Sequence, residues 1–467
     1  MTDQKGQSGG KTGFILLLAA GLAQFICCVD YFAVAIALPP MAKDLGVRAI
    51  DLQWVITGYI LSFSATLAIS GALGDRYGRK KLLLLGIIIF AAVSVWVGFG
   101  QDATQVIIAR IVLGLGGGLI FPLATAVVSH ASTKERLAAN IAMLTGVSTI
   151  GTAVGPVLGG VLAEFLDWRW IFFANVPICA VAFFMVLVFA RESTDPDAGG
   201  RLDFPGIILL FLGIGAFSVG IDRIPHWSLP AWAGLTGGGV VLLLLFMIIE
   251  LRVRTPVIDI RLFRNRAFLG FSTVGLLANS AWCVLVFVGT LQLQKVLGFT
   301  VLDAGMIFLF LSGSVAAASF LAPVLEPRLG AVGLSRIALL LQTIGIGLLF
   351  FLDTPFWLSL GMFIAGFGCS WGWAMPQAGA IGAIHRDKAG LASGSVLTLM
   401  ILAGNTAIVI VAMLIDLYPN DVDGEARGIR TSFLFASLTA LLGVGLSFLL
   451  LNRRMKASGD APAAAEA

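Results

Sequence analysis

Two ionisable residues interrupt long apolar stretches of the sequence and are the strongest candidates for chemistry. Asp30 lies in the apolar run 12–38, and Arg110 lies in the apolar run 104–129. A charged side chain near the centre of a membrane costs about 2.5–3.5 kcal/mol, so such residues normally face a partner or a cavity. A carboxyl group placed beside a guanidinium could take up and release a proton there. The alternative is a purely structural ion pair that holds two helices together.

A second candidate is the polar run 71–81, which separates the apolar runs 50–73 and 82–100. Glycine allows the backbone to turn sharply and lets helices approach closely. The Asp75 carboxylate can accept hydrogen bonds from the unpaired amides at the start of a helix. The spacing G-x-L-G-D-R-x-G-R-K-K is more detailed than an ordinary basic loop requires. We therefore interpret it as a gating loop formed by Gly71, Gly74, Asp75, Arg76, Gly78 and Arg79.

A third pattern is a series of small residues in the apolar run 137–163. Gly151, Gly155 and Gly159 recur every fourth residue, so they lie on one face of a helix, which another helix can meet backbone to backbone. Pro156 removes one intrahelical hydrogen bond and favours a bend. Generic helix packing is the alternative explanation. The residues of this pattern are Gly146, Gly151, Gly155, Pro156, Gly159 and Gly160.

Several amides and tryptophans also lie in apolar runs. Ring faces and amide groups in a cavity are what an amphipathic ligand needs. Each residue taken alone is better explained by a structural role, because tryptophan is enriched at membrane interfaces and buried amides often join helices. The substrate-cavity candidates are Gln24, Asn175, Asn279, Trp282, Gln292, Trp371, Gln377 and Asn405.

The composition indicates which elements position these residues. Of the 467 residues, 58% are hydrophobic and only 12% are charged, whereas soluble domains carry about 25% charged residues. The composition therefore predicts a single membrane domain, and the net charge of +4 does not indicate nucleic-acid binding. The five cysteines lie in apolar runs and the three histidines lie far apart in the sequence, so we expect no metal site and no cofactor.

A membrane-spanning helix needs about 20 apolar residues. Charged and Pro- or Gly-rich breaks divide the sequence into fourteen such stretches. The predicted spans are 12–38, 50–73, 82–100, 104–129, 137–163, 170–190, 204–222, 231–250, 268–294, 301–324, 332–352, 356–382, 390–416 and 430–451.

The distribution of Lys and Arg predicts the orientation of these spans. If both termini are cytoplasmic, 22 of the 30 Lys and Arg residues fall on cytoplasmic segments and seven fall on outer segments. Arg110 alone lies within a span. Cytoplasmic segments of membrane proteins carry an excess of Lys and Arg, so the imbalance favours an even number of spans with both termini inside.

The sequence also contains a weak internal repeat. Leu73 to Gly78 (LGDRYG) follows the second predicted span, and Leu325 to Gly330 (LEPRLG) follows the tenth. Two six-helix halves with two additional spans between them would place these turns equivalently. The expected organisation is a cytoplasmic tail 1–11, a six-helix bundle 12–200, two inserted helices and a linker 201–255, a six-helix bundle 256–453, and a cytoplasmic tail 454–467.

These motifs resemble those of a known family. The run 71–81 strongly resembles the signature loop of the major facilitator superfamily, and the glycine pattern around Pro156 looks like the antiporter motif found chiefly in its exporters. The segment 30–39 resembles the first-span motif of the family in Asp30 and in its Ala-Leu-Pro end, and the segment 110–117 resembles the fourth-span motif. Together with the segment 168–177 and the fourteen spans, the pattern is similar to the drug/proton antiporters of the EmrB/QacA type.

The resemblance implies an all-α membrane protein with the major facilitator fold: two six-helix bundles plus two additional helices. It implies proton-coupled export of small amphipathic molecules across the cytoplasmic membrane, by a monomer that is not an enzyme. Asp30 would carry the proton and Arg110 would bias its proton affinity. The alternatives are a proton-coupled importer of one specific solute, a membrane sensor or assembly factor on a transporter fold, and a membrane enzyme.

The sequence departs from the family pattern at several positions. Phe32 and Ala35 stand where the family usually has Thr and Asn, and Leu113 stands where it has Gln, so the expected site is drier. The second half carries no acidic residue at mid-span, because Asp303 and Asp416 both lie near the ends of spans. We therefore expect neutral, singly charged or anionic amphipathic substrates in preference to dications.

Overall fold

The computed structural model describes residues 11–132, 137–194, 204–253, 256, 258, 260–351, 354–384, 389–419 and 421–451. Within these ranges every regular element is a helix. The elements are α1 (Lys11–Asp44), α2 (Gln53–Tyr77), α3 (Arg79–Gly98), α4 (Ala103–Ala131), α5 (Leu137–Phe165), α6 (Arg169–Phe189), α7 (Phe204–Asp222), α8 (Leu229–Glu250), η1 (Ile260–Arg264), α9 (Arg266–Leu291), η2 (Gln292–Val296), α10 (Val301–Phe351), α11 (Pro355–Gly382), α12 (Ala389–Asp416) and α13 (Val422–Leu450).

Most of these helices are long and apolar enough to cross a membrane. Eleven helices of the described residues satisfy this criterion, or twelve if α2 is counted as one span across the 46° bend between its segments 53–67 and 69–77. The all-helical membrane fold predicted from the sequence is therefore confirmed. The count of fourteen crossings stays a prediction.

Helix α10 accounts for part of the difference in the count. Its bounds, Val301 to Phe351, enclose both predicted spans, 301–324 and 332–352, as two helices that meet at a kink. The break falls at Gly330, whose φ of 69° and ψ of 167° are not helical. Other predicted ends shift as well. For example, the span predicted to end at residue 38 continues in α1 through Pro39 and Pro40 to Asp44. The predicted tails 1–11 and 454–467 lie outside the described residues, apart from Lys11 at the start of α1.

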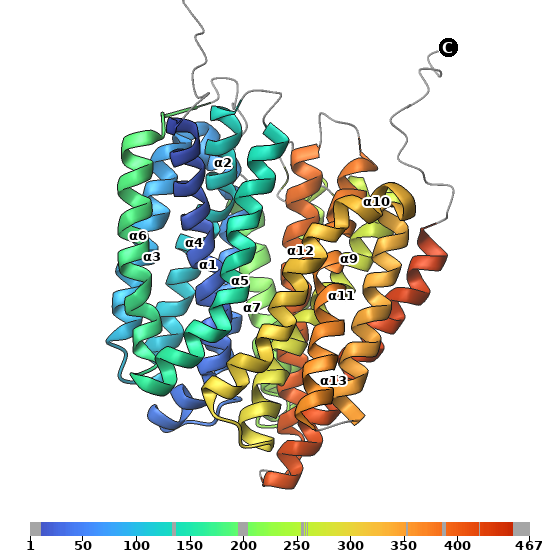
Figure 1. The fold of residues 1–467 in the computed structure, drawn as a ribbon. Coiled ribbons are helices and arrows are strands. Elements are labelled where there is room, and N and C mark those ends of the chain that lie inside the picture. Colours follow the sequence, from blue (N-terminus) through green and yellow to red (C-terminus); the bar gives the residue numbers. More distant parts are fainter. Residues whose placement is uncertain are drawn as a thin grey trace, which may run out of the picture.

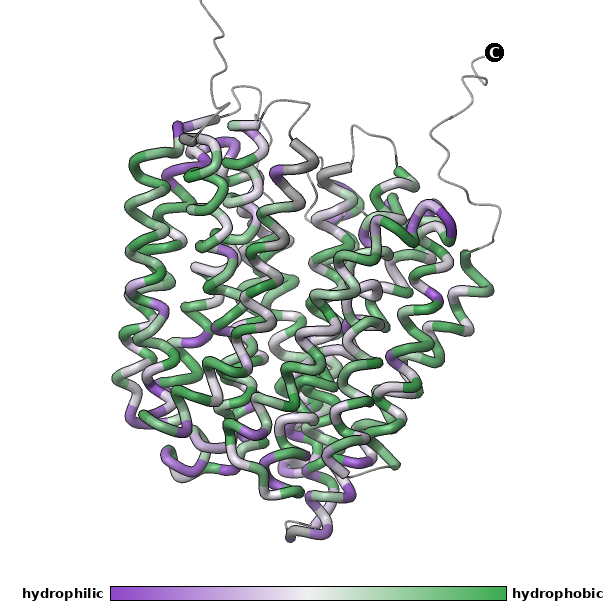
Figure 2. Tube along the Cα trace, viewed as in Figure 1, coloured by the Kyte–Doolittle hydropathy of each residue, from purple (hydrophilic) through white to green (hydrophobic). Residues whose placement is uncertain are grey.

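The helices form two groups that stand side by side (Figure 1). We call α1–α6 the N-terminal group and α9–α13 the C-terminal group. Helix α1 begins and α13 ends at the same end of the molecule (Figure 1). Hydrophilic residues gather at the two ends of the helices, and hydrophobic residues cover the length between them (Figure 2). This distribution is typical of a protein whose middle faces lipid.

The remaining helices, α7 and α8, pack against each other, and α7 contacts both α2 and α12. An apolar cluster joins these helices, with Leu61 from α2, Leu210 and Ile214 from α7, Phe246 from α8, and Leu402 from α12. The pair therefore lies across the boundary between the N-terminal and C-terminal groups.

Candidate functional site

Asp30 and Arg110 form an ion pair inside the N-terminal group, between α1 and α4. Both side chains are completely buried. The Arg110 Nη1 atom donates to Asp30 Oδ2, and Arg110 Nε donates to the Val55 carbonyl of α2 over 2.9 Å. Since each charge has an opposite charge at hydrogen-bond distance, burial of the pair is tolerated, but removal of either partner would leave an uncompensated charge.

Asn175 is the second partner of the Asp30 carboxylate. Its Nδ2 atom donates to Asp30 Oδ1 over 3.0 Å and lies 3.2 Å from Ser94 Oγ. The sequence had placed Asn175 among the substrate-cavity candidates, whereas the structure places it on α6, fully engaged with the buried pair. Both carboxylate oxygens of Asp30 therefore accept hydrogen bonds, one from Arg110 and one from Asn175.

Two aromatic rings cover the Arg110 guanidinium. Its Cζ atom lies 4.3 Å from the centre of the Tyr59 ring and 5.7 Å from that of Phe172. Cation–π contact of this kind is worth about 2 kcal/mol when desolvated. Tyr59 is also part of the wall of the central cavity, so one ring touches both the ion pair and the cavity.

A central cavity of about 300 Å³ lies between the N-terminal and C-terminal groups. Helices α1, α2, α4 and α5 form one side of it, and α9–α12 form the other. Its polar groups are hydroxyls, thiols, two indole N–H groups and one amide, and among its described lining residues there is no Asp, Glu, Lys, Arg or His. The aromatic residues in the wall are Tyr31, Phe32, Tyr59, Phe63, Phe121, Trp282 and Trp373.

The glycine pattern of α5 packs against α1. A Cβ atom at Gly159 would lie 2.6 Å from Ala33 Cα, one at Gly155 would lie 2.8 Å from Phe32 Cβ, and one at Gly151 would lie 2.7 Å from the Phe25 carbonyl oxygen. These approaches leave no room for a larger side chain. Because α1 carries Asp30, the small residues of α5 fix the position of the helix that bears the buried carboxylate.

The neighbouring residues of this pattern face the other group. A Cβ atom at Gly160 would lie 3.0 Å from the Val301 carbonyl oxygen, and one at Gly305 would lie 2.8 Å from the Pro156 carbonyl oxygen. Helix α5 therefore touches α1 along one face and the start of α10 along another. Gly146 also lies in α5.

The gating loop forms a tight turn between α2 and α3. Gly78 has a φ of 110°, and Asp75 pairs with Arg79 at 2.7 Å. Glu192, which the sequence did not single out, accepts hydrogen bonds from the backbone amides of Lys80 and Lys81 at the start of α3. The partial positive charge at the N-terminus of α3 favours a carboxylate at this position. The nearest atoms to a Cβ at Gly78 are those of the Glu192 carboxylate, so the glycine makes room for it.

The remaining motif residues surround this turn. Arg76 lies over the Tyr77 ring, a Cβ atom at Gly74 would lie 2.3 Å from Leu123 Cδ2, and Gly71 has open space around it. The weak repeat has a structural counterpart, because Gly330, which ends LEPRLG, also has a positive φ. Gly78 and Gly330 each end a helix and begin the next one.

Comparison with known proteins identifies the family. The model of the Major Facilitator Superfamily matches residues 20–408. The chain belongs to this superfamily. The superfamily membership predicted from the motifs is thus confirmed, and the chain is a multi-pass membrane transporter.

Its relatives within the superfamily include drug and antibiotic exporters. Puromycin resistance protein pur8 of Streptomyces alboniger is 31% identical, over 96% of this chain and 92% of that protein. Multidrug resistance protein Stp of Mycobacterium tuberculosis is 29% identical, over 82% of this chain and 72% of that protein. Cephamycin export protein CmcT of Amycolatopsis lactamdurans is 33% identical, over 64% of this chain and 62% of that protein.

Solved structures show the same fold. The nucleoside transporter NupG matches with a TM-score of 0.67 at 13% identity, covering 94% of this chain and 99% of that one. A bacterial homologue of the lysosomal transporter Spinster, in an inward-facing conformation, matches with a TM-score of 0.67 at 14% identity, covering 95% of this chain and 98% of that one. At this identity the likeness concerns the fold alone.

The structure brings only two of the eight substrate-cavity candidates into the wall of the central cavity. These two are Asn279 and Trp282. Asn279 also donates to the Met400 carbonyl over 2.8 Å. The other six lie outside the wall of this cavity. These six are Gln24, Asn175, Gln292, Trp371, Gln377 and Asn405.

The contacts of these residues explain their placement. Gln24 joins α1 to α4 and α5 through Phe121, Thr125 and Ser148. Trp371 donates to the Ala318 carbonyl, and Gln377 donates to the Trp373 carbonyl one turn earlier in α11. Gln292 and Asn405 are buried in η2 and α12 respectively.

Proposed function

We propose that this transporter exports small amphipathic molecules across the cytoplasmic membrane in exchange for protons, by alternating access. Three observations support the proposal. Several relatives are named as drug-resistance or antibiotic-export proteins. A buried carboxylate–guanidinium pair lies next to a central cavity. The α5 glycines that resemble an antiporter motif pack directly on the helix that carries the carboxylate.

The single observation that carries the proton coupling is the position of Tyr59 between the buried pair and the cavity. Its ring covers the guanidinium of Arg110 and forms part of the cavity wall. A substrate that displaces this ring would weaken the hold of Arg110 on Asp30 and change the affinity of the carboxylate for a proton. Substrate and proton would then compete without sharing a site, which is what exchange requires.

The cavity wall favours uncharged substrates. Asp30 and Arg110 compensate each other and are both fully buried, and the described lining contains no ionised side chain. Moving an ion from water into such surroundings carries a large desolvation cost unless an opposite charge compensates it. Aromatic rings and a few hydroxyl groups, by contrast, suit a neutral molecule with an aromatic body and one or two hydrogen-bonding groups.

The topology belongs to the same proposal. We infer fourteen crossings with both termini in the cytoplasm, and bundles 12–200 and 256–453 on either side of the inserted segment 201–255. The shared end of the first and last helices and the excess of Lys and Arg on that side support it (Figure 1). Reporter fusions at Pro196 and Pro225 should report opposite sides of the membrane; the same side for both would refute it.

Transport by the purified protein in liposomes tests the function. An imposed pH gradient should drive uptake of neutral aromatic compounds into vesicles that hold the protein in inside-out orientation. Matched compounds with a quaternary ammonium group should be transported at least about tenfold less well, because nothing in the wall neutralises their charge. Transport that ignores the pH gradient would exclude proton exchange, and equal transport of the charged compounds would exclude the substrate class. Uptake only in the opposite direction would favour the importer.

A further inference from the structure

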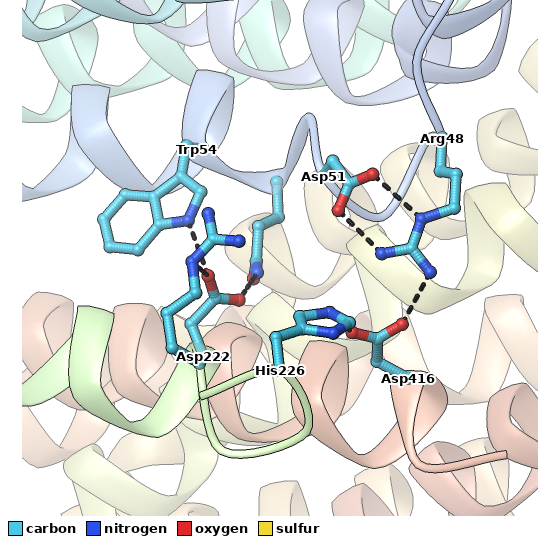
Figure 3. Close-up of polar contacts among 8 residues, drawn as sticks. Arg48, Asp51, Trp54, Asp222, His226 and Asp416 are labelled. Atoms are coloured by element: carbon cyan, nitrogen blue, oxygen red, sulfur yellow. Dashed lines mark hydrogen bonds and ion pairs between the residues drawn. The ribbon is translucent and has the colours of Figure 1, made fainter. Parts of the chain in front are cut away.

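The end of the molecule opposite the termini carries a cluster of polar contacts that involves both groups of helices and the inserted pair (Figure 3). Arg48 lies in the loop between α1 and α2, and Asp416 is the last residue of α12. Asp222 is the last residue of α7, and His226 lies in the loop that joins α7 to α8. The family motifs include none of these residues.

Asp416 is the point at which three parts of the chain meet. Arg48 Nη1 lies 2.7 Å from Asp416 Oδ1, and His226 Nε2 lies 2.5 Å from Asp416 Oδ2. Arg48 is itself held by two hydrogen bonds to Asp51, which raise its pKa and keep it charged. A carboxylate of the C-terminal group therefore binds a cation of the N-terminal group on one oxygen and the inserted pair on the other (Figure 3).

Asp222 fastens the inserted pair to the N-terminal group. Its carboxylate accepts hydrogen bonds from Gln53 Nε2 and from Trp54 Nε1, the latter at 3.1 Å. Both donors lie in the first turn of α2. Arg223 Nε lies 3.5 Å from the same carboxylate. Deeper in the molecule, the apolar cluster of α7 and α8 with α2 and α12 continues the same bridge.

Other contacts close the same end of the molecule. Gln294 Nε2 donates to the Ile36 carbonyl over 2.7 Å, and Glu164 Oε2 accepts from the Val301 amide over 3.2 Å. Each of these bonds joins the N-terminal group to the C-terminal group. Opening this end requires the two groups to separate, so the contact between Arg48 and Asp416 has to break.

We propose that the inserted pair α7–α8 is a strap that holds this end closed, and that Asp416 is its release point. When this end opens, the strap stays attached to α2, because two donors of α2 hold Asp222. Its contact with α12 breaks instead. The contact of His226 with Asp416 is the weaker attachment, because His226 lies in a loop and its side chain is 41% exposed. The role of the strap rests on the alternating access proposed above.

Labelling of a native cysteine tests the strap without any substrate or pH gradient. Cys283 lies in the cavity wall, so its reaction with a membrane-impermeant maleimide reports which end of the cavity is open. The rate is measured in right-side-out and in inside-out vesicles, by mass spectrometry of peptides from the labelled full-length protein, because Cys27 and Cys28 line the same cavity. From the strap side, Asp416→Asn should raise the rate about tenfold, since both attachments weaken, and His226→Ala should raise it about threefold.

Lys295→Gln is the matched control. Lys295 pairs with Glu425 at 2.7 Å at the same end, but both residues belong to the C-terminal group, so this pair need not break. Its rate should equal that of the unmodified protein. Unchanged rates for Asp416→Asn and His226→Ala in both vesicle types would overturn the proposal. A higher rate for Asp416→Asn alone would show that α7–α8 does not hold this end closed. If the proposed orientation is wrong, the higher rate appears in the other vesicle type. The labelling test needs no transport, so a failure of the transport experiment does not change its result.

Discussion

Two carboxylates, Asp30 and Asp416, each bind an arginine, yet their surroundings differ. The Asp30–Arg110 pair is wholly buried and lies within the N-terminal group, whereas Asp416 and Arg48 are partly exposed and belong to different groups. A pair within one rigid group can pass through a change of access unbroken. A pair between two groups has to break each time the groups separate.

The difference indicates how one chain can use the same chemistry for two tasks. Burial strengthens the contacts of Asp30 with Arg110 and Asn175, because little water screens their charges and dipoles. Solvent near Asp416 weakens each contact, which makes the contact suitable for repeated opening. We interpret the first as a site for proton exchange and the second as a fastening between moving parts.

Asp30→Asn should have the largest effect on transport. A small effect would contradict the distinction between Asp30 as a site for proton exchange and Asp416 as a fastening. Asparagine cannot release a proton, so we expect transport driven by a pH gradient to fall to the level of empty liposomes while substrate binding persists. Substrate exchange without a gradient is expected to survive. Full gradient-driven transport by this variant would rule out Asp30 as the proton carrier.

The control for this experiment is the double variant Asp30→Asn, Arg110→Gln. Removal of one member of a buried ion pair destabilises proteins by about 3–5 kcal/mol. If the pair is only structural, Asp30→Asn should lower the yield of folded protein, and the second substitution should restore both yield and transport. Restored yield without restored gradient-driven transport would support the proton-carrier role.

Gly159→Leu should have the next largest effect, because it displaces the helix that carries Asp30. A Cβ atom at this position would lie 2.6 Å from Ala33 Cα, and overpacking of this kind costs about 1–3 kcal/mol. We expect transport to fall at least about tenfold, with a smaller loss of thermal stability in detergent. Gly234→Leu in α8 is the control, since nothing lies within 4 Å of a Cβ there. Equal transport by the two variants would reduce the α5 pattern to ordinary packing.

The sequence predicted the helices well, because the apolar runs that cross a membrane are a local property. It also predicted the pairing of Asp30 with Arg110, because a charged side chain inside an apolar span needs a partner or a cavity. The break between the predicted spans 301–324 and 332–352 is likewise present, at Gly330. A single glycine with a positive φ interrupts the helix there without an intervening loop.

The remainder of the site depends on which face each residue presents, and that is set by tertiary packing. Asn175 lies 145 residues from Asp30 in the sequence, so no local pattern identifies it as a partner. Tyr59 and Phe63 look like ordinary apolar residues of a span until the fold turns them toward the cavity. The position of Asp416 at the end of a span gives no sign of a role, yet that position is where the two groups meet. Tyr59 and Phe63 are four residues apart and therefore lie on one face of α2. This spacing is the signal in the sequence that could have indicated an aromatic face.

Asn175→Ala should have the smallest effect and would sharpen the distinction between the two carboxylates. Asn175 donates to Asp30 Oδ1 and thereby helps to position the buried carboxylate. A typical hydrogen bond contributes about 0.5–1.5 kcal/mol, so we expect gradient-driven transport by Asn175→Ala to fall about threefold. Ser94→Ala removes the other contact of the Asn175 amide but leaves the bond to Asp30, so its transport should fall less. Equal transport by the two well-folded variants would mean that the bond between Asn175 and Asp30 contributes nothing to transport, because Ser94→Ala leaves that bond in place.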